Sequence, residues 1–317
     1  MLADADAIVR AEFITHVNPT KSCHAATIVD IGGGNVVAAW FGGTAESAPD
    51  VGIWLARFTS GSWSAPVEVA RATDGDSCYN PVLFHMASGE LLLFYKFGRG
   101  PSTWHGALKR SADGGKHWGQ SELLPACIFG PIKNPPMLRS DGTLICPSST
   151  EDSGWRVHFE FTSDAGRTWS KTEPVNDPQH IGAIQPSLLR LEGRRLRAIG
   201  RTRQGRLFAI DSPDDGATWG PMRLLDLPNP NSGTDALRLK DGRFLLVYNR
   251  SKTARSPLNV AISSDAEHWR DVLTLENQPG EFSYPTVVQA GDGKVHVVFT
   301  WNRVRIRHVV IDPARLK

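Results

Sequence analysis

The sequence predicts an all-β protein, a six-bladed β-propeller, on three observations. First, a box of the form Ser/Thr-x-Asp-x-Gly-x-x-Trp occurs three times, and a shortened copy and a degenerate copy extend the series. Second, the box tryptophans are 55, 51, 50 and 50 residues apart, at Trp63, Trp118, Trp169, Trp219 and Trp269. Third, short β-rich runs joined by glycine turns fill the intervals, without a long helical periodicity. Such a regular period indicates repeated units, and radial sheets bury a core between blades and protect their edges.

Each box is predicted to form a hairpin turn. In the copy at residues 162–169, Thr162 and Asp164 can bond backbone amides, Gly166 can take a positive φ, and Trp169 can cover the exposed side of the hairpin. We therefore expect the boxes to hold the blades together and to carry no chemistry.

The six repeats each contain three β-rich runs, taken here in chain order. They are residues 25–30, 36–41 and 51–58; 82–85, 91–95 and 106–110; 137–138, 144–146 and 156–161; 187–191, 196–199 and 206–210; 236–239, 244–248 and 258–262; and 286–289, 295–300 and 304–311. The last repeat has no box, so one terminus must supply its outer strand, and residues 12–17 are the predicted source.

Composition places few limits on function. The 317 residues are 40% hydrophobic and 21% charged, as in ordinary globular proteins, and we expect a single domain over residues 1–317. A formal charge of +2 favours neither nucleic acid nor a membrane as a partner. The first 13 residues do not resemble a signal peptide, and no apolar run has transmembrane length, so we expect a cytoplasmic protein. The four cysteines lack metal-site spacing and are expected to be free buried thiols.

Aligning the repeats predicts where a site lies. The residue that opens each innermost strand is polar in every repeat, namely His24, Asn80, Asn134, Gln185, Asp235 and Tyr284. Because strands alternate in direction, this position, the end of the second strand and the loop that follows share one end of the propeller, opposite the boxes. That end also collects Glu46, Asp50, Lys96, Trp104, Arg201, Arg203, Arg255 and Arg303. Cations outnumber acids there, which indicates a site for a carboxylate or sulfate, since guanidinium groups pair with planar anions in a bidentate manner.

On its boxes and repeat spacing, the chain resembles the sialidase (neuraminidase) superfamily over nearly its whole length. Members of that superfamily are six-bladed propellers with an arginine triad for the substrate carboxylate, a tyrosine nucleophile assisted by a glutamate, and an aspartate acid/base. The resemblance implies that Tyr284 is the nucleophile and that Arg201 (or Arg203) and Arg255 are two triad arginines.

The chain also departs from the family pattern. His24, within Cys23-His24-Ala25-Ala26, stands where the family has the arginine of an Arg-Ile-Pro motif, and Gln185 stands where the assisting glutamate is expected. The acid/base role would then fall to Glu46 or Asp50. These features indicate a divergent sialidase-like subgroup.

Tyr284, Asp235 and His24 have possible catalytic roles, and a structural role is the alternative for each. Tyr284 needs a base, for which Asp235 is the candidate, and His24 is a possible general acid or base near neutral pH. Each could instead be a buried residue satisfied by its neighbours. We expect Gln185, Asn80 and Asn134 to orient substrate hydroxyls or one another, Arg303 and Lys96 to bind substrate, and Trp104 to form part of the rim.

Three functions follow. The leading one is an exo-glycosidase for a terminal sugar that carries a carboxylate. The second is a lyase that cleaves uronic-acid linkages by β-elimination, with His24 and Tyr284 as base and acid. The third is a non-catalytic carbohydrate-binding propeller. The expected partner is an acidic mono- or oligosaccharide, and no cofactor or catalytic metal is predicted, because the ten histidines lack ligand spacing. The sequence leaves the oligomeric state open.

Overall fold

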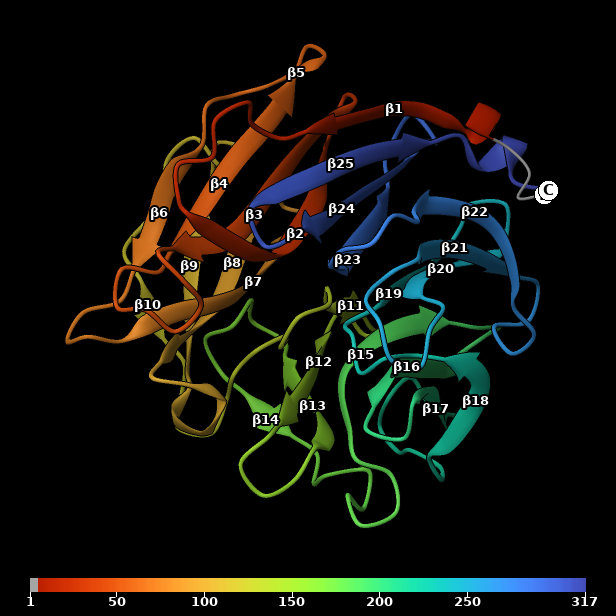
Figure 1. Ribbon diagram of the computed structural model, residues 1–317. Coiled ribbons are helices and arrows are strands. Elements are labelled where there is room, and N and C mark those ends of the chain that lie inside the picture. Colours follow the sequence, from red (N-terminus) through yellow and green to blue (C-terminus); the bar gives the residue numbers. More distant parts are fainter. Residues whose placement is uncertain (1–4) are drawn as a thin grey trace.

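The computed structural model describes residues 5–317, and the strands form six sheets around a ring (Figure 1). The predicted six-bladed β-propeller is confirmed. Residues 1–4, which belong to the stretch examined for a signal peptide, lie outside the described residues. Within residues 5–317, no helix has the length and apolar character needed to cross a membrane.

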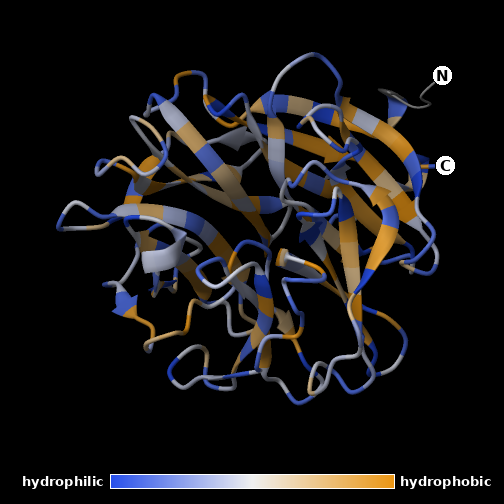
Figure 2. Cartoon of the chain, turned by 60° about the horizontal axis from the view of Figure 1, so that its bottom comes forward, coloured by the Kyte–Doolittle hydropathy of each residue, from blue (hydrophilic) through white to orange (hydrophobic). Residues whose placement is uncertain are grey.

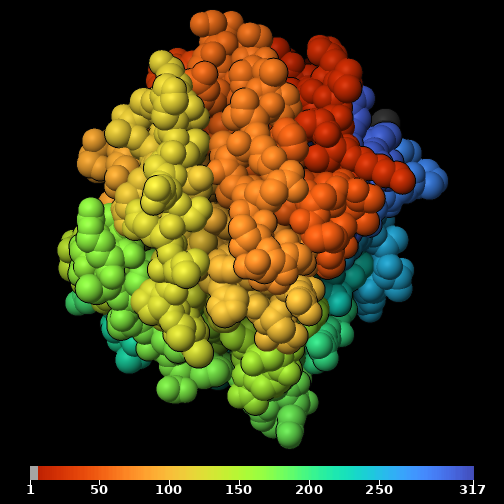
Figure 3. All heavy atoms as spheres, turned by 90° about the vertical axis from the view of Figure 1, so that its left-hand side faces the viewer, coloured from red at the N-terminus to blue at the C-terminus, as the bar shows by residue number. Residues whose placement is uncertain are grey.

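Blades 1 to 3 follow one another along the chain, and Figure 3 shows them as successive bands on one side of the molecule. Blade 1 contains β2 (Ser22–Gly32), β3 (Asn35–Gly43) and β4 (Gly52–Thr59), with β5 (Ser62–Trp63) and β6 (Val67–Arg71) both paired to β4. Blade 2 contains β7 (Ser77–His85), β8 (Leu91–Gly98), β9 (His105–Ser111) and β10 (Glu122–Leu123). Blade 3 contains β11 (Met137–Leu138), β12 (Leu144–Thr150), β13 (Arg156–Thr162) and β14 (Ser170–Lys171).

Blades 4 to 6 complete the ring. Blade 4 contains β15 (Ala183–Arg190), β16 (Leu196–Thr202), β17 (Arg206–Ser212) and β18 (Arg223–Pro228). Blade 5 contains β19 (Asp235–Arg238), β20 (Phe244–Asn249), β21 (Leu258–Ser263) and β22 (Arg270–Glu276). Blade 6 contains β23 (Phe282–Gln289), β24 (Val295–Trp301), β25 (Arg305–Ile311) and β1 (Ile8–Phe13). Short 3₁₀ turns are η1 (Ala5–Ala7), η2 (Pro101–Thr103) and η3 (Pro313–Arg315).

Blade 6 is closed by the N-terminal strand. β1 pairs antiparallel with β25, with Ala11 opposite Val309 and Phe13 opposite Arg307 (Figure 1). The prediction that a terminus supplies the outer strand of the last blade is correct. Of the predicted residues 12–17, however, only residues 12 and 13 belong to β1. The closing strand ends at Phe13, because the following residues form the connection to β2, and Val17 is 80% exposed.

The Asp boxes hold neighbouring blades together. Asp164 Oδ1 accepts hydrogen bonds from the amides of Arg167 (2.9 Å) and Thr168 (2.8 Å), as the hairpin prediction requires. Trp169 does more than cover its own hairpin, because it packs against the cluster around Phe94 of blade 2. Apolar residues of neighbouring blades meet in such clusters, and Figure 2 shows hydrophobic strands beside largely polar loops. Each box therefore connects two blades.

The innermost strands of blades 1, 2, 4 and 6 share a bulge at one end. Ala25, Asn80, Gln185 and Tyr284 all have a positive φ, and the strand register shifts at each of them. This bulge corrects the predicted alignment of blade 1, in which His24 was placed at the shared position. Ala25 occupies it, and His24 precedes it by one residue. Proline follows the bulge residue in blades 2, 4 and 6, whereas Ala26 follows it in blade 1. Without this proline, the sequence of blade 1 does not indicate where the bulge lies.

Candidate functional site

Tyr284 lies at the bulge of β23 with its ring mostly buried, at 8% exposure. Its hydroxyl accepts a hydrogen bond from Arg201 Nη1 at 2.8 Å. Arg201 lies near the end of β16 in blade 4, so residues 83 positions apart meet at the axis. The centre of the Arg255 guanidinium is 5.7 Å from the Tyr284 ring, and Lys133 Nζ is 5.9 Å from it. Negative charge that develops on the phenol oxygen would therefore be bonded to Arg201, while two further cations lie within 6 Å of the ring centre.

His24 packs against the same tyrosine. The two ring centroids are 4.3 Å apart, and His24 Nδ1 lies 2.8 Å from Thr300 Oγ1. Burial, and then the charges of Arg303, Arg255 and the other nearby cations, holds the pKa of His24 well below its ordinary value. The imidazole is therefore neutral near pH 7 and can accept a proton only with difficulty.

Two further arginines share one carboxylate beside this pair. Glu281 Oε1 accepts hydrogen bonds from Arg255 Nη1 (2.7 Å) and Arg303 Nε (2.9 Å). Burial opposes the ionisation of Glu281, but the two arginines hold its pKa below the ordinary value. Arg303 Nη1 donates in turn to Glu46, in the loop between β3 and β4. Blades 1, 5 and 6 thus meet through charged side chains.

Arg203 lies on the blade 4 side of the cluster. The guanidinium centres of Arg201 and Arg203 are 5.0 and 4.7 Å from the ring of Trp155. Glu151 is near the same residues, and burial raises its pKa although Arg201 opposes the shift. This side of the site therefore contains an aromatic face, two cations and a carboxyl group.

Asp235 does not have the environment predicted for a base that acts on Tyr284. Its carboxylate accepts hydrogen bonds from Ser187 Oγ (2.8 Å), Ala236 N (2.9 Å) and Val287 N (2.9 Å). Burial raises its pKa, although Lys133 opposes the shift. Because these contacts engage the carboxylate and no hydrogen bond joins it to Tyr284 among the described residues, the prediction for Asp235 is corrected to a structural role that joins the inner strands of blades 4, 5 and 6.

The prediction that Lys96 binds substrate is also corrected. Its side chain is fully buried, and Nζ donates to the carbonyl groups of Asn80 (3.4 Å) and Pro131. Burial lowers the pKa of Lys96 to about 7. This ammonium joins blade 2 to the segment that leads into blade 3, so it is not available to bind substrate.

The predicted amide residues line the axis. Asn134 Nδ2 donates to the backbone carbonyl of Gln185 at 3.1 Å, and Asn134 Oδ1 accepts from Lys133 Nζ at 2.7 Å. Gln185 Oε1 is buried and has no hydrogen-bond partner among the described residues. The Asn134 side chain therefore has structural contacts and the Asn80 backbone carbonyl accepts from Lys96, while Gln185 keeps a buried acceptor without a partner among the described residues.

Two predicted residues lie at the edge of this cluster. Trp104 follows η2, and its ring lies 5.2 Å from that of Tyr79. Asp50 closes its own loop, because its carboxylate accepts from Thr44 N (2.9 Å) and Thr44 Oγ1 (2.6 Å). Of the two alternatives for the acid/base residue, the structure brings Glu46 and not Asp50 into contact with the arginines.

The sequence reasoning missed Glu281 and Glu151. Glu281 immediately precedes β23, and Glu151 immediately follows β12, the second strand of its blade. The rule that identified Arg201 at the end of a second strand could have identified Glu151. Glu281 was missed because only the first residue of each innermost run was compared.

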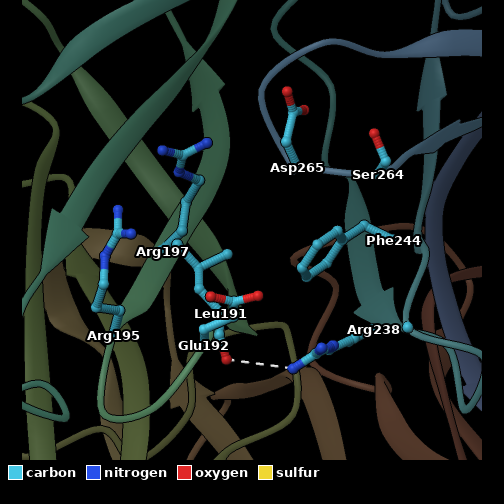
Figure 4. Close-up of a pocket in the computed structure, with 9 residues that line it drawn as sticks. Leu191, Glu192, Arg195, Arg197, Arg238, Phe244, Ser264 and Asp265 are labelled. Atoms are coloured by element: carbon cyan, nitrogen blue, oxygen red, sulfur yellow. Dashed lines mark hydrogen bonds between the residues drawn. The ribbon is translucent and has the colours of Figure 1, made fainter.

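A cavity of about 340 Å³ opens at the other end of the propeller, between blades 4 and 5 (Figure 4). It is lined by Arg197, from the start of β16, and by Asp265 of the shortened box, whereas Arg201 lies near the end of the same strand. We place the functional site at the Tyr284 end, because buried groups from four blades converge there. Among residues 5–317, no group of three His, Cys, Asp or Glu side chains is arranged to hold a metal.

The fold is that of a sialidase-like β-propeller. The family pattern described as "BNR repeat-like domain" matches residues 34–297, and the chain belongs to that family. A sialidase from Micromonospora viridifaciens is 27% identical over 152 residues, which is 44% of this chain but only 23% of the relative's length. The predicted resemblance to the sialidase superfamily is confirmed.

Solved structures share the fold at low identity. A protein of unknown function from Dyadobacter fermentans has a TM-score of 0.80 at 19% identity, covering 96% of this chain and 98% of its own. The NanB sialidase of Streptococcus pneumoniae has a TM-score of 0.79 at 13% identity, covering 94% and 69%. The intramolecular trans-sialidase of Ruminococcus gnavus has a TM-score of 0.79 at 13% identity, covering 99% of both chains.

Proposed function

We propose that this protein is a glycan-processing exo-glycosidase that acts on a terminal sugar bearing a carboxylate. The observation that carries the proposal is the convergence of Arg201, Arg255 and Arg303, from blades 4, 5 and 6, on the buried pair of Tyr284 and His24. Guanidinium groups suit a planar carboxylate, and the ring of Trp155 suits the apolar face of a sugar.

In this proposal, Tyr284 attacks the anomeric carbon, and Arg201 stabilises the negative charge that its oxygen acquires. A neutral phenol is a suitable nucleophile here, because it avoids repulsion with the substrate carboxylate. His24 replaces Asp235 as the group that takes the phenol proton. Because its lowered pKa makes it a weak base, the transfer depends on Arg201 stabilising the phenolate, and Glu46 transfers a proton to the leaving group. Two structural neighbours support a ligand with an acidic group, since the Ruminococcus gnavus enzyme was solved with oseltamivir carboxylate and the NanB sialidase with an ammonio-ethanesulfonate.

A β-elimination lyase is the second candidate. The observation that favours it is the neutral, buried His24 in ring contact with Tyr284, where the family has an arginine. In this chemistry the arginines neutralise a uronate carboxylate and acidify the adjacent C–H bond, while His24 and Tyr284 act as base and acid.

Incubation with a fluorogenic sialoside and, separately, with oligouronides tests these functions. Released fluorophore without new ultraviolet absorbance supports the glycosidase, unsaturated product supports the lyase, and binding without turnover supports a carbohydrate-binding propeller. Tyr284→Phe and His24→Ala are each expected to lower kcat at least about 100-fold. Tyr95→Phe is the matched control, because it removes another phenol hydroxyl, bonded to Ser121 Oγ away from the arginine cluster. Full activity in both site variants would contradict the assignment.

A further inference from the structure

The ion pair between Glu46 and Arg303 connects the two blades that flank the closure of the ring. Arg303 lies in the turn between β24 and β25 with φ of 56°, and its backbone carbonyl accepts a hydrogen bond from Cys23 N at 2.8 Å. The preceding residue, Asn302, exchanges two hydrogen bonds with the backbone of Glu281, at 2.7 and 2.8 Å. The turn that carries Arg303 is therefore attached to both β2 and the start of β23.

The two ends of the Arg303 guanidinium have different partners. Nε donates to Glu281, whose same oxygen also accepts from Arg255 and from Ser283 Oγ (3.0 Å). Nη1 donates to Glu46, whose side chain is 42% exposed and has Arg303 as its ion-pair partner. The Glu281 oxygen thus accepts from three donors, whereas the Glu46 carboxylate is exposed and pairs with Arg303.

The inner strand of blade 1 supplies no cation to the site. Its bulge position is Ala25, and the neighbouring His24 is held neutral by burial and by cations, among which Arg303 acts most strongly. Arg303 therefore brings positive charge to the side of the site where blade 1 has none.

We infer that Glu46 is an internal substitute for the substrate carboxylate. In the empty site it occupies Nη1 of Arg303, and a carboxylate-bearing sugar displaces it and takes its place between Arg303 and Arg255. Binding then frees the Glu46 carboxyl group from Arg303 and leaves it beside the site for the acid/base role in the proposed function. This inference rests on the proposed function, since it requires an acidic ligand at the arginine cluster.

Calorimetric titration of the Tyr284→Phe protein with N-acetylneuraminate and with glucuronate tests the inference. Adding Glu46→Gln is expected to lower Kd for the acid that binds about 2- to 5-fold, because a competing, partly exposed carboxylate is removed. Adding Arg303→Met is expected to raise Kd about 10-fold or more, because a charged hydrogen bond is lost. When both are added, Kd should equal that of Arg303→Met alone.

The protein with both added substitutions distinguishes displacement of Glu46 from a long-range effect of its charge. If Glu46→Gln tightens binding equally with and without Arg303, the effect is a long-range charge effect and the inference is wrong. Arg99→Met is the matched control, because this arginine is largely exposed, with its nearest acid, Asp76, at 3.9 Å. The methyl ester of the ligand should show no response to Glu46→Gln. Failure of both acids to bind would overturn the proposed function, whereas binding that is indifferent to Glu46 would overturn only the displacement.

Discussion

At the scale of single residues, the cations around Tyr284 divide into two kinds. Arg201 and Arg303 bond to groups in the site, Tyr284 and Glu46. Lys133 instead bonds to the carbonyl groups of Thr234 (3.0 Å) and Pro285 and to Asn134 Oδ1, so it connects blades 3, 5 and 6 at the axis. Burial lowers the pKa of Lys133 to about 8, although Asp235 opposes the shift. Its ammonium is the counter-charge of the buried Asp235 carboxylate.

Lys133→Met tests this structural role. The change keeps the apolar stem but leaves Asp235 and several oxygen acceptors without their cation, so we expect the free energy of unfolding to fall by about 3–5 kcal/mol. Urea denaturation measures the change. Lys171→Met is the control, because this exposed ammonium also donates to a carbonyl, Cys127 O at 2.9 Å, and its loss should have little effect. Equal stability of the two variants would show that Asp235 is satisfied by its other donors.

At the scale of elements, the box glycine is required by the neighbouring blade as well as by its own turn. Gly166 has φ of +94°, and a Cβ added there would lie 2.8 Å from Leu108 Cδ2 of blade 2. Gly242, in the turn between β19 and β20, has nearly the same φ, +93°, but an added Cβ would meet nothing within 4 Å. The two glycines differ in the contact between blades and not in backbone conformation.

Gly242→Ala should therefore cost only the left-handed conformation, about 1–2 kcal/mol. Gly166→Ala should cost a further 1–3 kcal/mol or so, because the methyl group overpacks the core between blades 2 and 3. Parallel urea titrations of the two variants measure the difference. If both lose the same stability, the box acts within its hairpin only, as the sequence alone predicts.

At the scale of the whole molecule, the ring closes over a buried pair of histidines. His296 Nδ1 on β24 lies 3.0 Å from His308 Nε2 on β25, and β1 covers them through Glu12, whose Oε1 is 3.3 Å from His308 Nδ1. Burial, and then the neighbouring His296, lowers the pKa of His308 to about 4, although Glu12 opposes the shift. The closing blade is therefore sensitive to acid.

This arrangement predicts a loss of stability at low pH. The unfolded chain binds a proton at His308 below its ordinary pKa of about 6.5, whereas the folded protein does so only near 4. The free energy of unfolding should accordingly fall as pH decreases through that window, by up to roughly 3 kcal/mol from this residue. Denaturation of the wild type at pH 7 and pH 5 should show the fall, and His308→Gln should reduce it. His16→Gln, at an exposed position, should leave it unchanged.

The sequence by itself determined the architecture and the end of the propeller at which the candidate site residues gather. Box spacing and glycine turns are local signals, because they report hydrogen bonds and side-chain alternation within one hairpin, and repetition makes them unambiguous. The aligned repeats and the alternating direction of successive strands placed Tyr284, Arg201 and Arg255 at one end, where the structure also has them. The alignment misplaced the start of blade 1 by one residue and missed Glu281 and Glu151.

Only the tertiary structure decided which of these side chains meet. His24 and Tyr284 come into contact because the ring closes and brings blades 1 and 6 together, and no periodicity in the chain encodes that contact. Asp235 and Lys96 lie at the predicted end but turn into the protein, where burial and backbone partners occupy them. The pairing of Arg303 with Glu46 likewise depends on a turn and a loop from opposite ends of the chain, because charges separated by hundreds of residues can interact only after the blades have packed.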